Sequence, residues 1–276
     1  MPMGINVNLA AQSALQNLNQ TQSDLAVTQR RISTGQKVAN ASDNGATFAI
    51  AQNQRGTSRA YNTVMESLNR VQSTTDVASA AAGVVSDLLL QMKEKALAAV
   101  DSSVDTTSRS ILNTDFTALR DQINKAVNNA TFNGVNLLNG NSGNISALAS
   151  DTGTSKLTVK TQSMQLGGAN NVGVTATLAF TSVTTASTAL TKVNASIAAI
   201  SISLANLGTS SRMIAQHRDF ISKMQDAVDA GISNITDADL SKESSKLQSL
   251  QTKQQLGYQA LSIANSSTQS LLSLFR

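Results

Sequence analysis

The stretch VMESLNRVQSTTDVASAAAGVVSDLLLQMKEKALAAV, from Val64 to Val100, repeats apolar or small side chains in alternating steps of four and three residues. The positions that keep this spacing are Val64, Leu68, Val71, Thr75, Ala78, Ala82, Val85, Leu89, Met92 and Ala96. A mean spacing of 3.5 sustained over this length is typical of helices in coiled-coil-like contact. The stretch therefore predicts a long helix that packs lengthwise against other helices.

Two further segments repeat the same spacing. One runs through Leu112, Phe116, Leu119, Ile123, Ala126 and Ala130, and the other through Leu190, Val193, Ile197, Ile200, Leu204, Leu207, Ser211, Ile214, Arg218 and Ile221. The chain has one proline, Pro2, so little interrupts long helices. A single helix over residues 47–100 would span roughly 80 Å. The predicted fold is mainly α, a long coiled-coil-like helical rod.

The two ends of the chain carry thinner apolar lines. Ala11, Leu18, Leu25 and Ile32 recur every seven residues near the start, and the corresponding C-terminal line is Leu240, Leu247, Leu250, Leu261, Ala264, Leu271 and Phe275. Segments this rich in Gln, Asn, Ser and Thr bury too little to offset their ordering entropy alone. We expect the N- and C-terminal helices to pair, and residues 1–40 and 237–276 to fold largely when partners bury them.

Turn signals mark the boundaries of these helices. Gly35 is placed to end the first helix, and Ser42 or Asp43 could cap the next. Asp237 or Asp239 could cap the last helix. In the middle of the chain, the Asn133-Gly134 pair and the alternating stretches KLTVKT and VGVTATLAF predict a small β-hairpin region over residues 139–187.

Composition weighs against several classes of function. Aromatic residues make up 3% of the chain and cysteine is absent, which leaves no disulfide, thiolate nucleophile or zinc–sulfur site. The net charge is +4, but the basic residues are scattered singly among acids, so we expect no nucleic-acid partner. We expect no membrane insertion, because no continuous apolar run of about 18 residues occurs, and no secretory signal peptide, because residues 1–20 lack Lys and Arg.

Catalytic and metal-binding patterns are equally weak. The single histidine, His217, falls on a predicted helix with no nucleophile and acid arranged around it, so a surface role is expected. Gly167-Gly168 precedes no helix and reads as a turn. Asp237, Asp239 and Glu243 lack the spacing of a calcium loop. We therefore predict no enzyme, no catalytic residue, no cofactor and no metal.

Three separated motifs resemble those of bacterial flagellin, in the same order along the chain. They are LNQTQSDLAVTQRRISTGQKVANASDNGATFAIA (Leu18–Ala51), NNATFNGVNLLNG (Asn128–Gly140) and DADLSKESSKLQSLQTKQQLGYQALSIANSSTQSLLSLFR (Asp237–Arg276). The resemblance covers roughly residues 1–140 and 187–276 and implies a minimal type without large outer variable domains. It implies a secreted structural subunit that self-assembles into the extracellular filament of the bacterial flagellum, used for motility, and that is exported by the flagellar type III pathway without a cleaved signal peptide.

The resemblance also implies a division of the chain and a set of partners. Residues 1–40 and 237–276 would form an inner coiled coil, 41–138 and 188–234 the two parts of a helical rod domain, and 139–187 a β region at the outer surface. The partners would be other flagellin subunits, a flagellin export chaperone on residues 237–276, and hook-associated junction and cap proteins. Gln91 and Lys95 stand where we would expect Arg and Leu, which predicts weak or absent recognition by an innate immune receptor.

Two sets of residues are candidate sites. The predicted subunit interface comprises Leu18, Leu25, Ile32, Leu247, Leu261, Leu271 and Phe275, with Arg31, Asp43 and Arg59 fixing register between subunits. For these charges a solvated surface is an equally good interpretation. Thr181, Ser182, Thr184, Thr185, Ser187 and Thr188 could accept O-linked sugars or form an ordinary polar loop. The alternative functions are a hook–filament junction protein and a secreted helical adaptor or adhesin.

Overall fold

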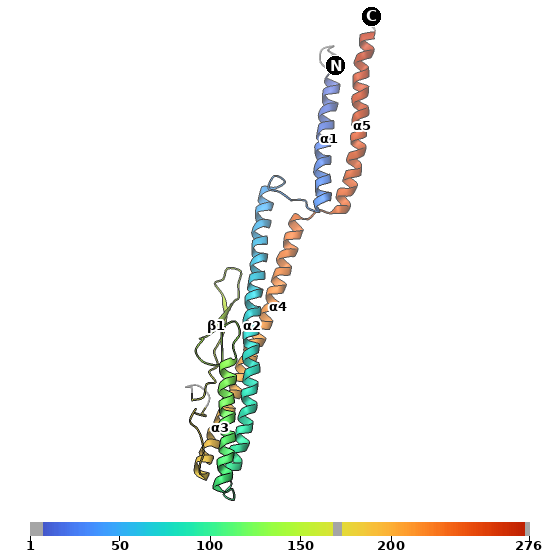
Figure 1. The fold of residues 1–276 in the computed structure, drawn as a ribbon. Helices are drawn as coiled ribbons and strands as arrows, with labels where there is room; N and C mark the ends of the chain where they lie inside the picture. The colour runs from blue at the N-terminus through green and yellow to red at the C-terminus, as the bar shows by residue number, and fades with distance from the viewer. Residues whose placement is uncertain (1–7, 168–172, 274–276) are drawn as a thin grey trace. The chain divides into compact units, whose positions relative to one another are not determined.

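The computed structural model describes residues 8–167 and 173–273 and is mainly helical, as the apolar spacing predicts (Figure 1). The described elements, in chain order, are α1 (Leu9–Thr34), α2 (Gly45–Val100), α3 (Thr106–Asn129), β1 (Ile145–Leu148), β2 (Lys156–Val159), α4 (Val183–Thr236) and α5 (Leu240–Ser273). The expected fold class, long helices with a small β-hairpin and paired terminal helices, is confirmed.

The chain divides into two compact units. The terminal unit combines residues 1–57 with residues 226–276, and the central unit comprises residues 58–225. Because α2 and α4 each contribute residues to both units, the terminal unit holds the start of α2 and the end of α4.

The core of the central unit follows the predicted line on α2. Val64, Leu68, Ala82, Val85 and Leu89 are buried almost completely. Polar contacts tie α2 to α4: Gln72 Nε2 donates to Ser211 Oγ at 2.7 Å, and Gln225 Nε2 donates to Asn62 Oδ1 at 3.0 Å.

The buried line on α4 differs in part from the expected one. Val193, Ile200, Leu207, Ile214 and Ile221 are buried as predicted, but Ser196 and Ser203 are fully buried while their neighbours Ile197 and Leu204 are half-buried. Ser196 is buried because Val174 packs beside it: the Val174 main-chain N–H donates to Ser196 Oγ at 3.3 Å. Apolar spacing alone missed these two positions because serine counts as polar.

The helix α4 is apolar in composition over part of its length. An 18-residue window within it has a mean hydropathy of 1.3, so its length and composition alone would suit a membrane span. Core helices share this composition, and α4 buries Ile200, Leu207 and Ile214 within the central unit. The prediction of no membrane insertion rested on the lack of a continuous apolar run of about 18 residues, and this helix, interrupted throughout by serine and threonine, does not contradict it.

The β region is smaller than predicted. Strands β1 and β2 pair antiparallel, with Ile145 opposite Val159 and Leu148 opposite Lys156. The Asn133-Gly134 pair forms a tight turn with φ angles of 49° and 78°, closed by an isolated bridge between Phe132 and Val135.

The expected strand in VGVTATLAF is absent: residues 173–180 form no strand. Val174, Leu178 and Phe180 are buried at intervals that imitate a strand pattern, but the N–H groups of Val174 and Phe180 bond to side chains and that of Leu178 to the Thr175 carbonyl in a turn. The Phe180 main-chain N–H donates to Asn113 Oδ1 at 2.7 Å, and the Phe180 ring packs edge-on against Phe116 with centroids 5.0 Å apart.

A buried arginine holds the turn between α2 and α3. Arg109 is 7% exposed, and its guanidinium donates from Nε to the Ala99 carbonyl at 2.9 Å and from Nη2 to the Asp101 and Val104 carbonyls at 3.1 and 2.8 Å. These carbonyls belong to the last turn of α2 and the connection after it, which have no intrahelical donors. The side chain thus acts as a C-terminal cap supplied by the following helix.

We expect the substitution Arg109→Ala to lower the free energy of unfolding by about 2 kcal/mol, because it removes the guanidinium that donates to the Ala99 and Val104 carbonyls. Denaturation of the full chain followed by far-UV circular dichroism measures this loss. Arg212→Ala removes an exposed arginine from α4 and serves as the control, with an expected change of less than about 0.5 kcal/mol. Equal losses in both variants would contradict the capping role.

Candidate functional site

Within the terminal unit, α1 and α5 lie side by side and run antiparallel (Figure 1). Asn8 Nδ2 near the start of α1 donates to the Ala264 carbonyl at 2.9 Å, and Arg31 Nη1 near its end donates to Glu243 Oε1 at 3.1 Å. Most of the buried and half-buried positions keep a four–three spacing. Those that keep it are Ala11, Ala14, Leu18, Thr21, Leu25, Thr28 and Ile32 on α1, and Glu243, Leu247, Leu250, Gln254, Gly257, Leu261 and Ala264 on α5. We call these fourteen residues the terminal seam.

Five of the residues predicted for a subunit interface lie in this terminal seam. Leu18 is buried, and Leu25, Ile32, Leu247 and Leu261 are half-buried. They lie on the lines along which the two ends of one chain face each other. The other two apolar residues of the predicted interface are Leu271 and Phe275. The Leu271 side chain and Phe275 lie outside the part of the chain that the structure describes.

The connections after α1 and before α5 are bonded to each other. Gly35 ends α1 with a φ of 69°, as expected, and its carbonyl accepts from the Ala238 N–H at 2.9 Å. The Thr236 carbonyl accepts from the N–H groups of Lys37 at 2.6 Å and Val38 at 3.2 Å. We call this set of contacts the crossing. It fixes the end of α1 beside the start of α5.

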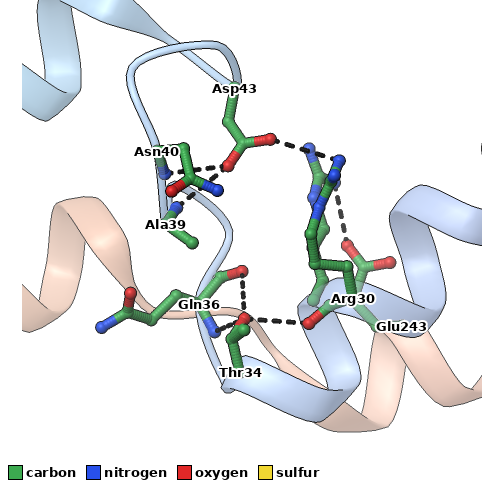
Figure 2. A network of polar contacts seen from close by, with 8 residues as sticks. Arg30, Thr34, Gln36, Ala39, Asn40, Asp43 and Glu243 are labelled. Carbon is green, nitrogen blue, oxygen red and sulfur yellow. Dashed lines mark hydrogen bonds and ion pairs between the residues drawn. The ribbon is translucent and has the colours of Figure 1, made fainter.

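Asp43 organises the loop that follows the crossing (Figure 2). Its Oδ2 accepts from the N–H groups of Ala39 and Asn40, both at 3.1 Å, and its Oδ1 lies 3.5 Å from Arg30 Nη2. The pKa of Asp43 is lowered, first by the hydrogen bond from the Asn40 main chain, then by that from Ala39 and by the positive charges of Arg30 and Arg31, while burial opposes the shift. The carboxylate therefore closes a loop within its own chain.

The helix caps differ in part from those expected. Asn44, not Ser42 or Asp43, caps α2: its Oδ1 accepts from the Thr47 N–H at 3.0 Å, because the Asp43 carboxylate is already engaged in the loop. At the start of α5, the cap at Asp239 is confirmed. Its Oδ1 accepts from Ser241 and Lys242 N–H at 3.0 and 3.1 Å.

The remaining predicted residues occupy different settings. Arg31 pairs with Glu243 of the same chain, whereas Arg59 is exposed on α2. The expected loop of hydroxyl side chains is largely helical, because α4 begins at Val183 and the proposed boundary at 187/188 falls inside it. Ser182 and Thr185 form a reciprocal cap at this start. All six side chains in the set are exposed: Thr181, Ser182, Thr184, Thr185, Ser187 and Thr188.

Large apolar side chains also point away from the terminal seam. Leu256 and Ile263 on α5 are 57% and 69% exposed, and Leu9 and Leu15 on α1 and Leu240 on α5 are also exposed. We call these five residues the outer apolar set. Apolar spacing predicted Leu240 on the facing line and did not identify the others, although Leu256 and Ile263 are seven residues apart. Exposed apolar groups on both helices of a thin pair are suited to contact with other protein surfaces.

The arrangement defines a helical structural protein whose two ends pair and present apolar side chains outward. Residues 5–143 match the bacterial flagellin N-terminal helical region, and residues 181–275 match the bacterial flagellin C-terminal helical region. The chain belongs to the bacterial flagellin family. It is therefore a structural subunit that polymerises with its own kind into the extracellular flagellar filament.

Two relatives in sequence agree with this assignment. Flagellin FljM of Caulobacter vibrioides is 52% identical over 99% of this chain and 98% of its own, and a flagellin of Brucella melitensis is 36% identical over 99% of both chains. The crystal structure of Bacillus cereus flagellin is similar with a TM-score of 0.41 and 21% identity, covering 62% of this chain and 88% of that one. Full-length similarity to flagellins favours the filament subunit over the junction protein and the adaptor.

The loop held by Asp43 is expected to open in acid. Because its pKa in the folded chain lies below the ordinary 3.8, its stabilising contribution is present above 3.8 and is lost as the pH falls through the lower folded value. The amide chemical shifts of Ala39 and Asn40 should therefore titrate with a midpoint below 3.8, and Asp43→Asn should abolish this titration. A midpoint at or above 3.8 would contradict the network.

Proposed function

We propose that the α1–α5 pair is the device through which the subunits polymerise, and that its outer apolar set makes the contacts between copies. The observation that supports this most directly is the exposure of Leu256 and Ile263 on a helix whose other face is already occupied by α1. Contacts that repeat head to tail without closing a ring generate a helical filament.

We also propose that these terminal helices order fully only on assembly. On α1 the buried residues are Leu18 and Thr28. Several positions of the terminal seam carry a hydroxyl or amide side chain, and one is glycine. Such a pair gains little from burial against the entropy of ordering two helices. Neighbouring subunits would supply the missing burial by covering the outer apolar set.

The double substitution Leu256→Ser and Ile263→Ser tests the assembly role. We expect it to reduce the yield of filaments at least about tenfold in seeded assembly, because it removes exposed apolar area that only a partner would bury. Negative-stain electron microscopy and sedimentation measure the yield. Far-UV circular dichroism of the same samples should show helicity rising on polymerisation in the wild type.

Ile111→Ser is the matched control, since Ile111 is an exposed apolar residue of α3 in the central unit. Normal filaments from the double variant, or the same loss in the control, would count against the proposed device. Constant helicity before and after polymerisation would instead refute folding on assembly alone.

The partners beyond the filament follow from the same segments. We propose that the export chaperone binds residues 237–276 as a helix in a groove before assembly, that the flagellar type III pathway exports the chain, and that junction and cap proteins contact the ends of the filament. Residues 1–40 and 237–276 would then line the inner filament, and residues 139–187 its outer surface. O-linked sugars would have accessible acceptors in the exposed hydroxyl set at residues 181–188.

We propose that the innate immune receptor responds weakly or not at all to this chain. Gln91 is exposed, and Lys95 Nζ donates to Asp115 Oδ2 of α3 at 2.7 Å, so an ion pair stands where the resemblance leads us to expect an apolar leucine. A cell reporter should stay silent at ordinary flagellin doses. The variant carrying Gln91→Arg and Lys95→Leu should gain a response, and a full response to the unmodified chain would refute the proposal.

A further inference from the structure

We infer that two contacts between α1 and α5, Leu18 against Gly257 and Arg31 with Glu243, set the register in which the two ends of one chain pair. This inference rests on the proposed role of the α1–α5 pair in assembly. It makes these four residues positioning residues, which act by aligning the outer apolar set and not by touching the next subunit.

The first contact is steric. Leu18 is 5% exposed, the most buried apolar side chain of α1, and it lies over Gly257. A Cβ atom at position 257 would lie 3.1 Å from Leu18 Cδ1 and 3.9 Å from Leu18 Cβ. Glycine therefore provides the hole that accepts the leucine, at the cost of a residue that weakens a helix. A slip of seven residues would set Leu18 opposite the larger Leu250 or Ala264.

The second contact is ionic and lies near the other end of the pair. Glu243 occupies a position of the terminal seam that would ordinarily be apolar, and its side chain is 12% exposed beside an Arg31 side chain that is 28% exposed. Arg31 Nε and Glu243 Oε2 are buried without a hydrogen-bond partner among the described residues. A pair satisfied on one side only adds little stability, but in any other register both buried charges would lose their partner.

The two contacts agree on a single alignment. Leu18 and Arg31 are separated by 13 residues on α1, and Gly257 and Glu243 by 14 on α5, as an antiparallel pair in one register requires. The alignment decides which part of α1 lies beside Leu256 and Ile263. A slipped pair would present the outer apolar set in another arrangement, which the next subunit could not match.

Cysteine cross-linking reads the register directly, because the chain contains no native cysteine. The 3.9 Å separation of Cβ positions at 18 and 257 lies within the about 3.5–4.5 Å that a disulfide requires. We would oxidise L18C/G257C and two control variants shifted by one heptad, L18C/L250C and L18C/A264C, as soluble subunits and as filaments. We expect L18C/G257C to cross-link within one chain at least about tenfold faster than either control.

A reciprocal exchange tests whether the members of each contact act on each other during assembly, while the cross-linking reads the register itself. Gly257→Leu should reduce filament yield at least about tenfold, and adding Leu18→Ala should restore it to within about twofold, because the leucine and its hole exchange helices. Arg31→Glu should likewise fail alone and recover when combined with Glu243→Arg. Failure of a paired variant to recover would show that its two residues do not act on each other and would count against that contact.

Each result has a defined consequence. Faster cross-linking of a shifted pair, disulfides between chains, or no preference for L18C/G257C in filaments would overturn the inference. Failure of the wild type to form filaments while L18C/G257C cross-links preferentially in the soluble subunit would reject the proposed assembly function and leave the register intact. If filaments form and a shifted pair cross-links in them, the proposed register would be rejected and the proposed assembly function would stand.

Discussion

The crossing is the constraint on which the terminal unit depends. Three main-chain hydrogen bonds join residues 35–38 to residues 236–238, and a buried Thr236 and Val38 shield them. Because α1 ends at Thr34 and α5 begins at Leu240, the two helices start from a common point and can lie antiparallel without a long connection. The crossing thus holds the end of α1 beside the start of α5 through main-chain hydrogen bonds.

The two units differ in how much burial their helices provide. In the central unit α2, α3 and α4 bury complete lines of apolar side chains, with Phe116, Ile123 and Met92 fully enclosed. In the terminal unit the facing lines include Thr21, Thr28 and Gln254, and few positions are buried. A core of the first kind can hold a subunit together, whereas the second kind gains its stability mainly where further surfaces are added. This contrast is the physical basis for an assembly role at the chain ends.

Much of this structure could be predicted because apolar spacing reports helices well when the line is long. The lines on α2 and at Val193, Ile200 and Leu207 were visible for this reason. Serine at 196 and 203 was not, because a small polar side chain is buried only where another segment packs closely and offers a hydrogen bond.

The candidate site could also be predicted only in part from the sequence. The pairing of the two ends and the caps at Gly35 and Asp239 followed from residue type, but the partner of Arg31 did not. Its partner, Glu243, lies 212 residues away in the sequence, and no local pattern specifies that distance. Residues 173–180 show the converse error, because a strand was predicted where none forms. Apolar residues recur there at strand-like intervals, but the N–H groups of Val174 and Phe180 bond to side chains and not to a neighbouring strand.

Polar residues in the terminal seam have a physical consequence that stability alone does not explain. An uninterrupted apolar line would bind more tightly, but leucine opposite leucine is nearly equivalent in registers seven residues apart, and a two-helix pair of this length would then populate several of them. A glycine hole and a buried charge remove that degeneracy, because each has one acceptable neighbour on the opposite helix. A filament repeats one contact through every subunit, so an alignment error in one chain would be transmitted to its neighbours. A weaker but uniquely aligned pair is therefore the better solution for a subunit of this kind.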